Sequence, residues 1–300
     1  MRSRLYRATL GALVDRRAGR LFLLSAVPLI WIIGCNVGPL VQVFRISFLA
    51  QYPIAEGAEA AYTLDNYAVF FVSPVYFVPF VRSLVFAALA TAATLVIVYP
   101  AAFYIAKVVR PARRTKALLL LLVPFWAGEI IRTFSVIMLL ANRGPINMVL
   151  RDLGLIDRPI PLLYGYFSLG FGVVYLVCLY MLLPLYSAIE KIPSHLLDAA
   201  ADLGAGPFTR FRRIVLPLSK DGIVSGCSLV FLTCTGVFAA PMLLGGAGTA
   251  LFPETIASFF QGASNRWPTG AAFASLMLVA ALVTAGSFMR VVGGRAAKEA

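Results

Sequence analysis

The stretch DAAADLGAGPFTRFRRIVLP occupies residues 198–217 and lies between two long apolar runs. Its first part has the apolar spacing of a short amphipathic helix, and Asp198 stands in the first turn, where the helix dipole favours a carboxylate. We expect Ser194 to cap the start of this helix. We expect Gly204 to end it, because glycine readily takes the positive φ of a helix C-terminus.

A second short helix is predicted directly after this glycine. Pro207 suits its first position, where a backbone N–H is not needed, and Pro217 is expected to end it. One face of this helix is apolar and consists of Phe208, Phe211, Ile214 and Val215. Two helices this short are not stable alone. The stretch therefore predicts a helix–turn–helix elbow that needs a partner surface.

The chain around the elbow is strongly apolar. Of its 300 residues, 60% are hydrophobic and 13% are charged, which is typical of a membrane protein. A helix needs about 20 apolar residues to cross a bilayer. We therefore predict an all-α polytopic membrane protein with six transmembrane helices. The six apolar runs lie at about 21–44, 81–107, 117–141, 164–188, 222–245 and 270–290.

Two of these runs carry pairs of glycines four residues apart. The pairs are Gly34-x-x-x-Gly38 and Gly222-x-x-x-Gly226. Small residues at this spacing let helix backbones approach closely in a membrane. Both pairs are therefore candidates for close helix contact.

The positive charges are unevenly distributed. Lysine and arginine number 26 against 13 acidic residues, and most of them lie at the two termini and in the loops after the second and fourth runs. Cytoplasmic loops are enriched in lysine and arginine. Both termini and the elbow, between spans four and five, are therefore expected in the cytoplasm. This pattern accounts for the net charge of +13 without a nucleic-acid partner.

The sequence lacks the motifs of several enzyme classes. It contains no G-x-x-x-x-G-K-[ST] loop for ATP, no HExxH and no GxSxG. The single histidine, His195, borders the elbow, and the four cysteines form no CxxC pair. These observations favour a transporter component without its own ATPase site, without a metal site and without a catalytic residue.

The spacing within the elbow is more specific than its composition. Asp198-Ala199-Ala200, three residues, Gly204, nine residues, Ile214, one residue and Leu216-Pro217 resemble the EAA loop of ABC importer permeases. In that family the loop forms a coupling helix that docks into a groove on a separate ATPase subunit. Here Asp198 replaces the usual glutamate and keeps its charge. The resemblance implies that the coupling residues are Asp198, Ala199, Ala200, Gly204, Arg210, Phe211, Arg213, Ile214 and Pro217.

The resemblance covers most of the chain. Within the family, the chain resembles the spermidine/putrescine type of permease. The matching stretches are 63–67 (TLDNY), 124–126 (PFW), 132–134 (RTF), 183–186 (LPLY) with 190–191 (EK), 243–246 (LLGG) and 267–272 (WPTGAA). The resemblance implies an assembly of two permease chains, two copies of an ATPase and a periplasmic solute-binding protein, in a bacterial inner membrane. ATP and magnesium would bind to the ATPase, so no cofactor is expected in this chain.

This resemblance suggests a division of the chain into three parts. We predict a basic cytoplasmic N-terminal segment at 1–20, a transmembrane permease domain at 21–290 and a cytoplasmic tail at 291–300. The coupling loop lies at about 190–220, within the permease domain.

Charged residues within a predicted span mark a candidate substrate path, because charges are costly inside a membrane. Glu129 and Arg132 share a face near the middle of the third run. They either form an ion pair that locks two helices together, or Glu129 faces a cationic substrate beside the aromatic rings of Trp126 and Phe134. Tyr175 is a further candidate for the path.

One departure from the family leaves the solute open. Polyamine-type permeases commonly carry acidic residues on both sides of the FxxP of the fifth span. Here the flanking residues are Val237 and Met242, which are apolar. The carried solute is therefore either polyamine-like or an opine, an amino-acid-like compound or an aminophosphonate. A self-sufficient secondary transporter is a further alternative, but the sequence has no convincing inverted repeat.

Overall fold

The described part of the chain is built from helices. The computed structural model describes residues 25–26, 28–54, 59–246, 248–261 and 266–293. Within these ranges the nearest approach to a strand is an isolated bridge between Leu49 and Tyr62. The predicted N-terminal segment at 1–20 lies outside the described residues, as do residues 294–300 of the predicted tail.

Five helical stretches in the described ranges are long and apolar enough to cross a membrane. They are Pro28–Ser47, Pro74–Val108, Glu129–Asp152, Tyr166–Glu190 and Trp267–Val292. Helix α14 (Lys220–Gly236) follows the helical stretch Pro207–Leu218 at a bend of 67°, and this pair brings the number of candidate spans to six. The predicted all-α polytopic fold is confirmed.

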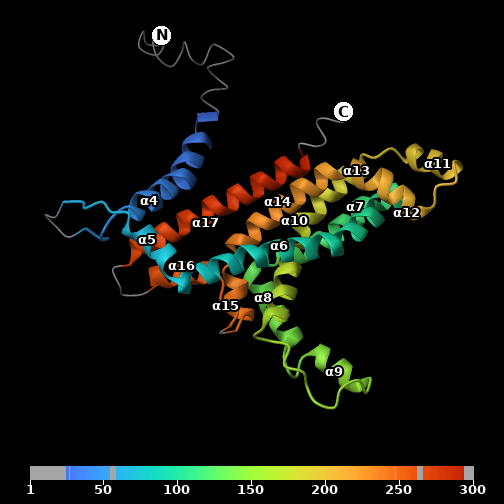
Figure 1. Cartoon of the computed structure of the whole chain (residues 1–300). Coiled ribbons are helices and arrows are strands. Elements are labelled where there is room, and N and C mark those ends of the chain that lie inside the picture. Colours follow the sequence, from blue (N-terminus) through green and yellow to red (C-terminus); the bar gives the residue numbers. More distant parts are fainter. Residues whose placement is uncertain (1–24, 27, 55–58, 247, 262–265, 294–300) are drawn as a thin grey trace, which may run out of the picture.

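Three helices form the centre of the molecule. Helix α10 (Tyr166–Glu190) packs against α6 (Pro74–Phe103) and against α14, and these two also pack against each other (Figure 1). In the most apolar 18-residue segment of α10, 56% of the residues are buried, a larger share than in any other candidate span of the described residues. This central position follows from an apolar surface on every side of α10.

Glycines allow α10 and α14 to approach closely. A Cβ atom placed on Gly222 would lie 2.8 Å from the Pro184 carbonyl oxygen, and one on Gly226 would lie 2.8 Å from the sulfur of Met181. The predicted close contact of the second glycine pair is confirmed. Gly34 has no atom near its Cβ position, so the first pair makes no such contact within the described residues.

A second cluster of buried side chains lies at the end of the bundle opposite the elbow. Helices α5 (Asp65–Val72), α16 (Phe252–Gln261) and α17 (Trp267–Phe288) meet α6 there, around the ring of Phe70. Two of the family-like stretches also meet at this end, because the Thr269 hydroxyl donates a hydrogen bond of 3.1 Å to the Asn66 side chain. These stretches therefore have a structural role.

Helix α4 (Gly38–Ser47), continuous with the π-helical turn η2 (Ile33–Val37), diverges from the bundle (Figure 1). The apolar window of this span is only 6% buried, and its described contacts with another span are those with α17. The described residues therefore leave most of an apolar helix without a protein neighbour.

The third predicted span is broken, and the expectation of one continuous helix over 117–141 is wrong. Helix α7 (Pro111–Leu122) passes into a 3-10 turn, η4 (Val123–Trp126), and α8 (Glu129–Leu140) begins afresh. Pro124 cannot donate a backbone hydrogen bond, and Gly128 takes an extended ψ of 157° as the N-cap of α8. Glu129 therefore begins a helix. A further helix, α9 (Pro145–Asp152), follows.

The fifth predicted span, at 222–245, is broken as well. Helix α14 ends at Gly236, Val237 is extended, and a short helix α15 (Ala239–Leu244) follows. Pro241 supplies the physical reason, because its ring would clash with the carbonyl of Val237, four residues earlier, in a continuous helix. The polar backbone groups exposed by the two breaks lie within otherwise apolar segments.

Candidate functional site

The first half of the elbow is helix α11 (Ser194–Asp202), which ends as the sequence predicts. Gly204 has a φ of 77°, and its N–H donates a hydrogen bond of 2.8 Å to the Ala201 carbonyl. The Ala205 N–H donates one of 2.9 Å to the Ala200 carbonyl. This pair of bonds is the Schellman motif. The expected cap at the other end is wrong, since Pro193 holds the N-cap position and Ser194 is the first helical residue.

The second half of the elbow is longer than predicted. Pro207 begins α12 (Pro207–Arg210), as expected, but the chain continues through the π-helical turn η5 (Phe211–Val215) into α13 (Leu216–Leu218). The expectation that Pro217 ends the helix is wrong. Pro217 lies in the first turn of α13, after the π-helical turn, where its missing N–H is tolerated.

Contacts with α6 anchor the second half of the elbow. The ring of Phe211 meets that of Tyr99 edge-on at 5.5 Å, and Val215 is buried. The Tyr99 hydroxyl also shares a hydrogen bond of 2.7 Å with Ser219, at the end of the elbow. A guanidinium nitrogen of Arg210 reaches the Leu197 carbonyl at 3.5 Å, which links the two halves. The second half of the elbow is therefore packed against α6.

The tip of the elbow exposes apolar side chains. Leu203 is 89% exposed and Phe208 is 73% exposed. Phe208 belongs to the predicted apolar face of the second helix, and both side chains are available to the partner surface that the elbow is predicted to need. Of the predicted coupling residues, Asp198, Ala199, Arg213 and Pro217 are exposed, whereas Ala200, Arg210, Phe211 and Ile214 are partly buried.

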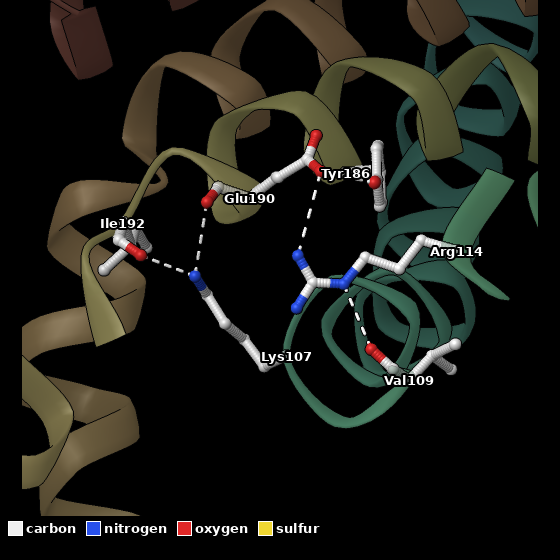
Figure 2. A network of polar contacts seen from close by, with 6 residues as sticks. All are labelled: Lys107, Val109, Arg114, Tyr186, Glu190 and Ile192. Atoms are coloured by element: carbon white, nitrogen blue, oxygen red, sulfur yellow. Dashed lines mark hydrogen bonds and ion pairs between the residues drawn. The ribbon is translucent and has the colours of Figure 1, made fainter. Parts of the chain in front are cut away.

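A polar network holds the base of the elbow to the π-helical turn η3 (Tyr104–Val108), which follows α6, and to the start of α7 (Figure 2). The ammonium group of Lys107 donates hydrogen bonds to the carbonyls of Ile192 at 2.5 Å and Glu190 at 3.3 Å. The Glu190 carboxylate accepts one from the Tyr186 hydroxyl at 2.7 Å and lies 3.8 Å from Arg114. The loops after the second and fourth predicted spans therefore lie at the same end of the molecule, as the charge pattern indicates.

A second candidate site surrounds the two helix breaks. A cavity of about 360 Å³ is lined by α8, α10 and the segment between α14 and α15. It brings together residues that are far apart in the sequence. The lining residues are Glu129, Arg132, Leu176, Val177, Tyr180, Thr233, Gly236, Val237, Phe238 and Ala239.

Arg132 is the buried charge of this cavity, with 7% of its surface exposed. One terminal guanidinium nitrogen donates a hydrogen bond of 3.2 Å to the Leu176 carbonyl, and the guanidinium carbon lies 5.1 Å from the centre of the Phe125 ring. Its Nε atom has no hydrogen-bond partner. The predicted ion pair with Glu129 is not formed, because within the described ranges the one ion pair joins Arg114 and Glu190.

The aromatic residues proposed for the path, Trp126, Phe134 and Tyr175, do not line this cavity. Trp126 is 90% exposed, and Phe134 is 49% exposed. Neither lines the cavity, and Phe125 instead of these two contacts Arg132. Tyr175 lines a separate apolar groove with Phe167 and Phe171. Thr233 had no signal in the sequence, and Phe125 lay in a family-like stretch without any indication that it contacts Arg132.

Metal ligands are not clustered in the described ranges, where no group of three or more His, Cys, Asp or Glu side chains is placed to hold an ion. Glu254, in α16 and outside the candidate spans, has a partly buried carboxyl group. Burial raises the pKa of its carboxyl, and a hydrogen bond from the backbone at Leu251 partly offsets this.

Comparison with known proteins gives consistent matches. The spermidine/putrescine transport system permease protein PotB of Haemophilus influenzae is 39% identical over 249 residues, which cover 81% of this chain and 83% of that protein. PotB of Escherichia coli K12 is 38% identical over 242 residues, 81% of this chain and 86% of that protein. The inner membrane ABC transporter permease protein YdcU of the same organism is 30% identical over 274 residues, 86% and 85% of the two chains. No family model matches.

Solved structures support the fold. A chain of a bacterial ABC transporter that imports the acidic polysaccharide alginate superposes with a TM-score of 0.71 at 19% identity, over 97% of this chain and 98% of that chain. The same transporter in complex with a periplasmic protein bound to an alginate pentasaccharide gives 0.69 at 19% identity, over 96% and 97%. At this identity the likeness concerns the fold alone.

Proposed function

The chain belongs to the PotB-type permeases of ABC importers, and we propose that its elbow at 198–217 is the surface through which a separate ATPase drives transport. It is a permease subunit and a multi-pass protein of the bacterial inner membrane. The observation that carries the proposal is the bare apolar tip formed by Leu203 and Phe208, on a segment anchored to α6. An exposed apolar patch rimmed by polar residues is typical of a docking surface.

The coupling follows from how the elbow is held. When ATP binding closes the ATPase dimer, the docked elbow moves with it, and Phe211 and Val215 transmit the displacement to α6. The polar network around Glu190 and Lys107 holds the base of the elbow against the segment that joins α6 to α7. In this scheme ATP and magnesium bind to the ATPase, and this chain contributes no ATPase site.

The assembly and its orientation belong to the same proposal. We expect two ATPase copies, a second permease chain and a periplasmic solute-binding protein. The elbow, the basic loops and both termini would face the cytoplasm. The complex of the alginate transporter with a periplasmic protein supports the last of these partners by likeness of fold. The division into 1–20, 21–290 and 291–300 stays a prediction.

The carried solute is proposed to be a small polar organic compound. The names of the PotB relatives favour spermidine or putrescine. Val237 and Met242 leave an opine, an amino-acid-like compound or an aminophosphonate as the alternative, because they remove two acidic partners of a polycation. Glu129, Arg132, Trp126, Phe134 and Tyr175 are the proposed path residues.

A pull-down of the tagged full-length chain in mild detergent tests the proposal. Mass spectrometry of the recovered partners should identify an ATPase with a phosphate-binding loop and a second permease. We expect Leu203→Asp and Phe208→Asp to reduce ATPase recovery by tenfold or more, because each places a charge in an apolar contact. Leu155→Asp is the matched control, since Leu155 is also exposed and follows α9, which lies away from the elbow (Figure 1).

Two results would contradict the proposal. If the chain is recovered alone or only with itself, a self-sufficient secondary transporter becomes the better interpretation. If the ATPase is recovered equally with the two tip variants and with the control, the elbow tip is not the docking surface.

A further inference from the structure

The cavity at the two helix breaks has the features of a built polar site inside the membrane. One wall is the start of α8, after the break at Ala127 and Gly128, and another is the break at Val237 and Phe238. Broken helices leave backbone donors and acceptors without intrahelical partners, and in transporters such breaks face a solute path. The volume of about 360 Å³ is within the range of small-molecule pockets.

Arg132 gives the cavity one incomplete cation. Only 7% of its surface is exposed. One terminal nitrogen donates a hydrogen bond to the Leu176 carbonyl, and Nε has no hydrogen-bond partner. A buried guanidinium without an anion is costly, and its remaining donors fit a carboxylate or phosphonate oxygen. The cavity therefore lacks an acceptor at this point.

Glu129 gives the same cavity one available anion. Its side chain is exposed, and within the described ranges no hydrogen bond or ion pair engages its carboxylate. It lines the cavity together with Arg132 without pairing to it. The two charges are thus open to different groups of one occupant.

The balance of these charges selects among solutes. A polycation would meet one carboxylate in this cavity and would be repelled by Arg132, while Val237 offers it no charge. A solute that carries both a negative and a positive charge would give Arg132 and Glu129 each an oppositely charged partner. We propose that the cavity binds a small amino acid-like solute whose carboxylate or phosphonate contacts Arg132 and whose ammonium group contacts Glu129. This inference rests on the proposed function, since it names the solute class of the same path.

A matched pair of probes tests this inference on the complete importer, purified with its ATPase and second permease. Ornithine is putrescine with one added carboxylate, so the two differ only in the group that Arg132 would bind. The reporter is Thr233→Cys, in a chain whose four native cysteines are replaced by alanine, and the readout is the rate of maleimide labelling. Thr233 lines the cavity and bonds only within its own helix, to the Leu229 carbonyl.

We expect ornithine to slow labelling at concentrations at least tenfold lower than putrescine, which corresponds to one charge-assisted hydrogen bond. Arg132→Gln should abolish this preference, and Glu129→Gln should weaken protection by both probes. Asp152→Asn is the control, because it removes an exposed acid on α9, outside the cavity, and should change neither value.

The probe itself provides a second test if Arg132→Gln does not assemble. Ornithine methyl ester lacks the anionic group and should lose the tenfold advantage on the unaltered cavity. The inference is overturned if putrescine protects as well as ornithine, or if the ester protects as well as the acid. Loss of the ATPase from the purified importer would instead count against the proposed function.

Discussion

Gly204 is the residue whose conformation the elbow requires most directly. Its φ of 77° lies in the left-handed region, yet a Cβ there would meet no atom within 4 Å. Strain alone therefore determines the cost of a substitution, about 1–2 kcal/mol. We expect Gly204→Ala to weaken docking of the ATPase by about tenfold without unfolding the chain, measured as the affinity between purified subunits.

Gly206 supplies the control for this prediction, two residues further on. Its Cβ position is equally open, but its φ is −64°, which alanine adopts without strain. Gly206→Ala should leave the affinity unchanged. Equal affinities for the two variants would show that the turn at Gly204 does not set the elbow geometry.

Lys107 and Glu190 are predicted to contribute unequally to stability, although both belong to one network (Figure 2). Lys107 satisfies the carbonyls of Glu190, at the end of α10, and of Ile192, just after it, so Lys107→Met should cost about 1–2 kcal/mol. Glu190 lies 3.8 Å from Arg114, and its side chain is 44% exposed, so Glu190→Gln should cost less than about 1 kcal/mol. Thermal unfolding in detergent measures both, and a larger loss for Glu190→Gln would contradict this ranking.

Helices α10 and α14 offer a contrast between two glycines that look alike in the sequence. A Cβ on Gly222 would lie 2.5 Å from that of Ala188, so Gly222→Ala should force the helices apart and destabilise the protein by about 1–3 kcal/mol. Gly170, within α10, has no atom near its Cβ position, so Gly170→Ala should stabilise it by up to about 1 kcal/mol. A neutral or stabilising effect of Gly222→Ala in a thermal unfolding assay would rule out close packing at Gly222.

The sequence predicts whole helices better than their breaks, and proline shows why. Pro100 lies inside α6 without interrupting it, whereas Pro241 accompanies the break between α14 and α15. The difference depends on neighbouring helices, which satisfy or fail to satisfy the freed backbone groups. Hydropathy alone therefore describes 117–141 and 222–245 as continuous runs.

The two candidate sites differ in how much of each is predictable. Gly204 and Pro207 have strong local preferences, so the turn of the elbow follows from the residues themselves. Glu129 and Arg132 are conspicuous because charges in an apolar run are rare. Their separation, and the contribution of Phe125, depend on tertiary packing that no local pattern records.

In the molecule as a whole, the span that contains α4 has the smallest buried share of the described candidate spans. Its apolar window is 6% buried, and Trp31 on the same span is 71% exposed. A second permease chain would cover such a surface. We expect a photoreactive amino acid at Trp31 to cross-link this chain to the second permease in membranes, detected as an adduct by mass spectrometry. The same group at Val177, buried in α10, should give none. Absence of an adduct from Trp31 would mean that lipid covers the helix.

The orientation of the molecule is predicted from charge and tested by labelling. Lys107 and Arg114 lie at the elbow end, and α9 lies away from it (Figure 1). Because lysine and arginine are retained on the cytoplasmic side, the elbow end should face the cytoplasm. In a chain without native cysteines, Asp157→Cys should react with a membrane-impermeant maleimide in spheroplasts. Ala112→Cys should react only in inside-out vesicles, since both positions are exposed and differ in the end they occupy. The reverse pattern would place the elbow outside, where no ATP-driven subunit could reach it, and the coupling proposal would then fail with the orientation.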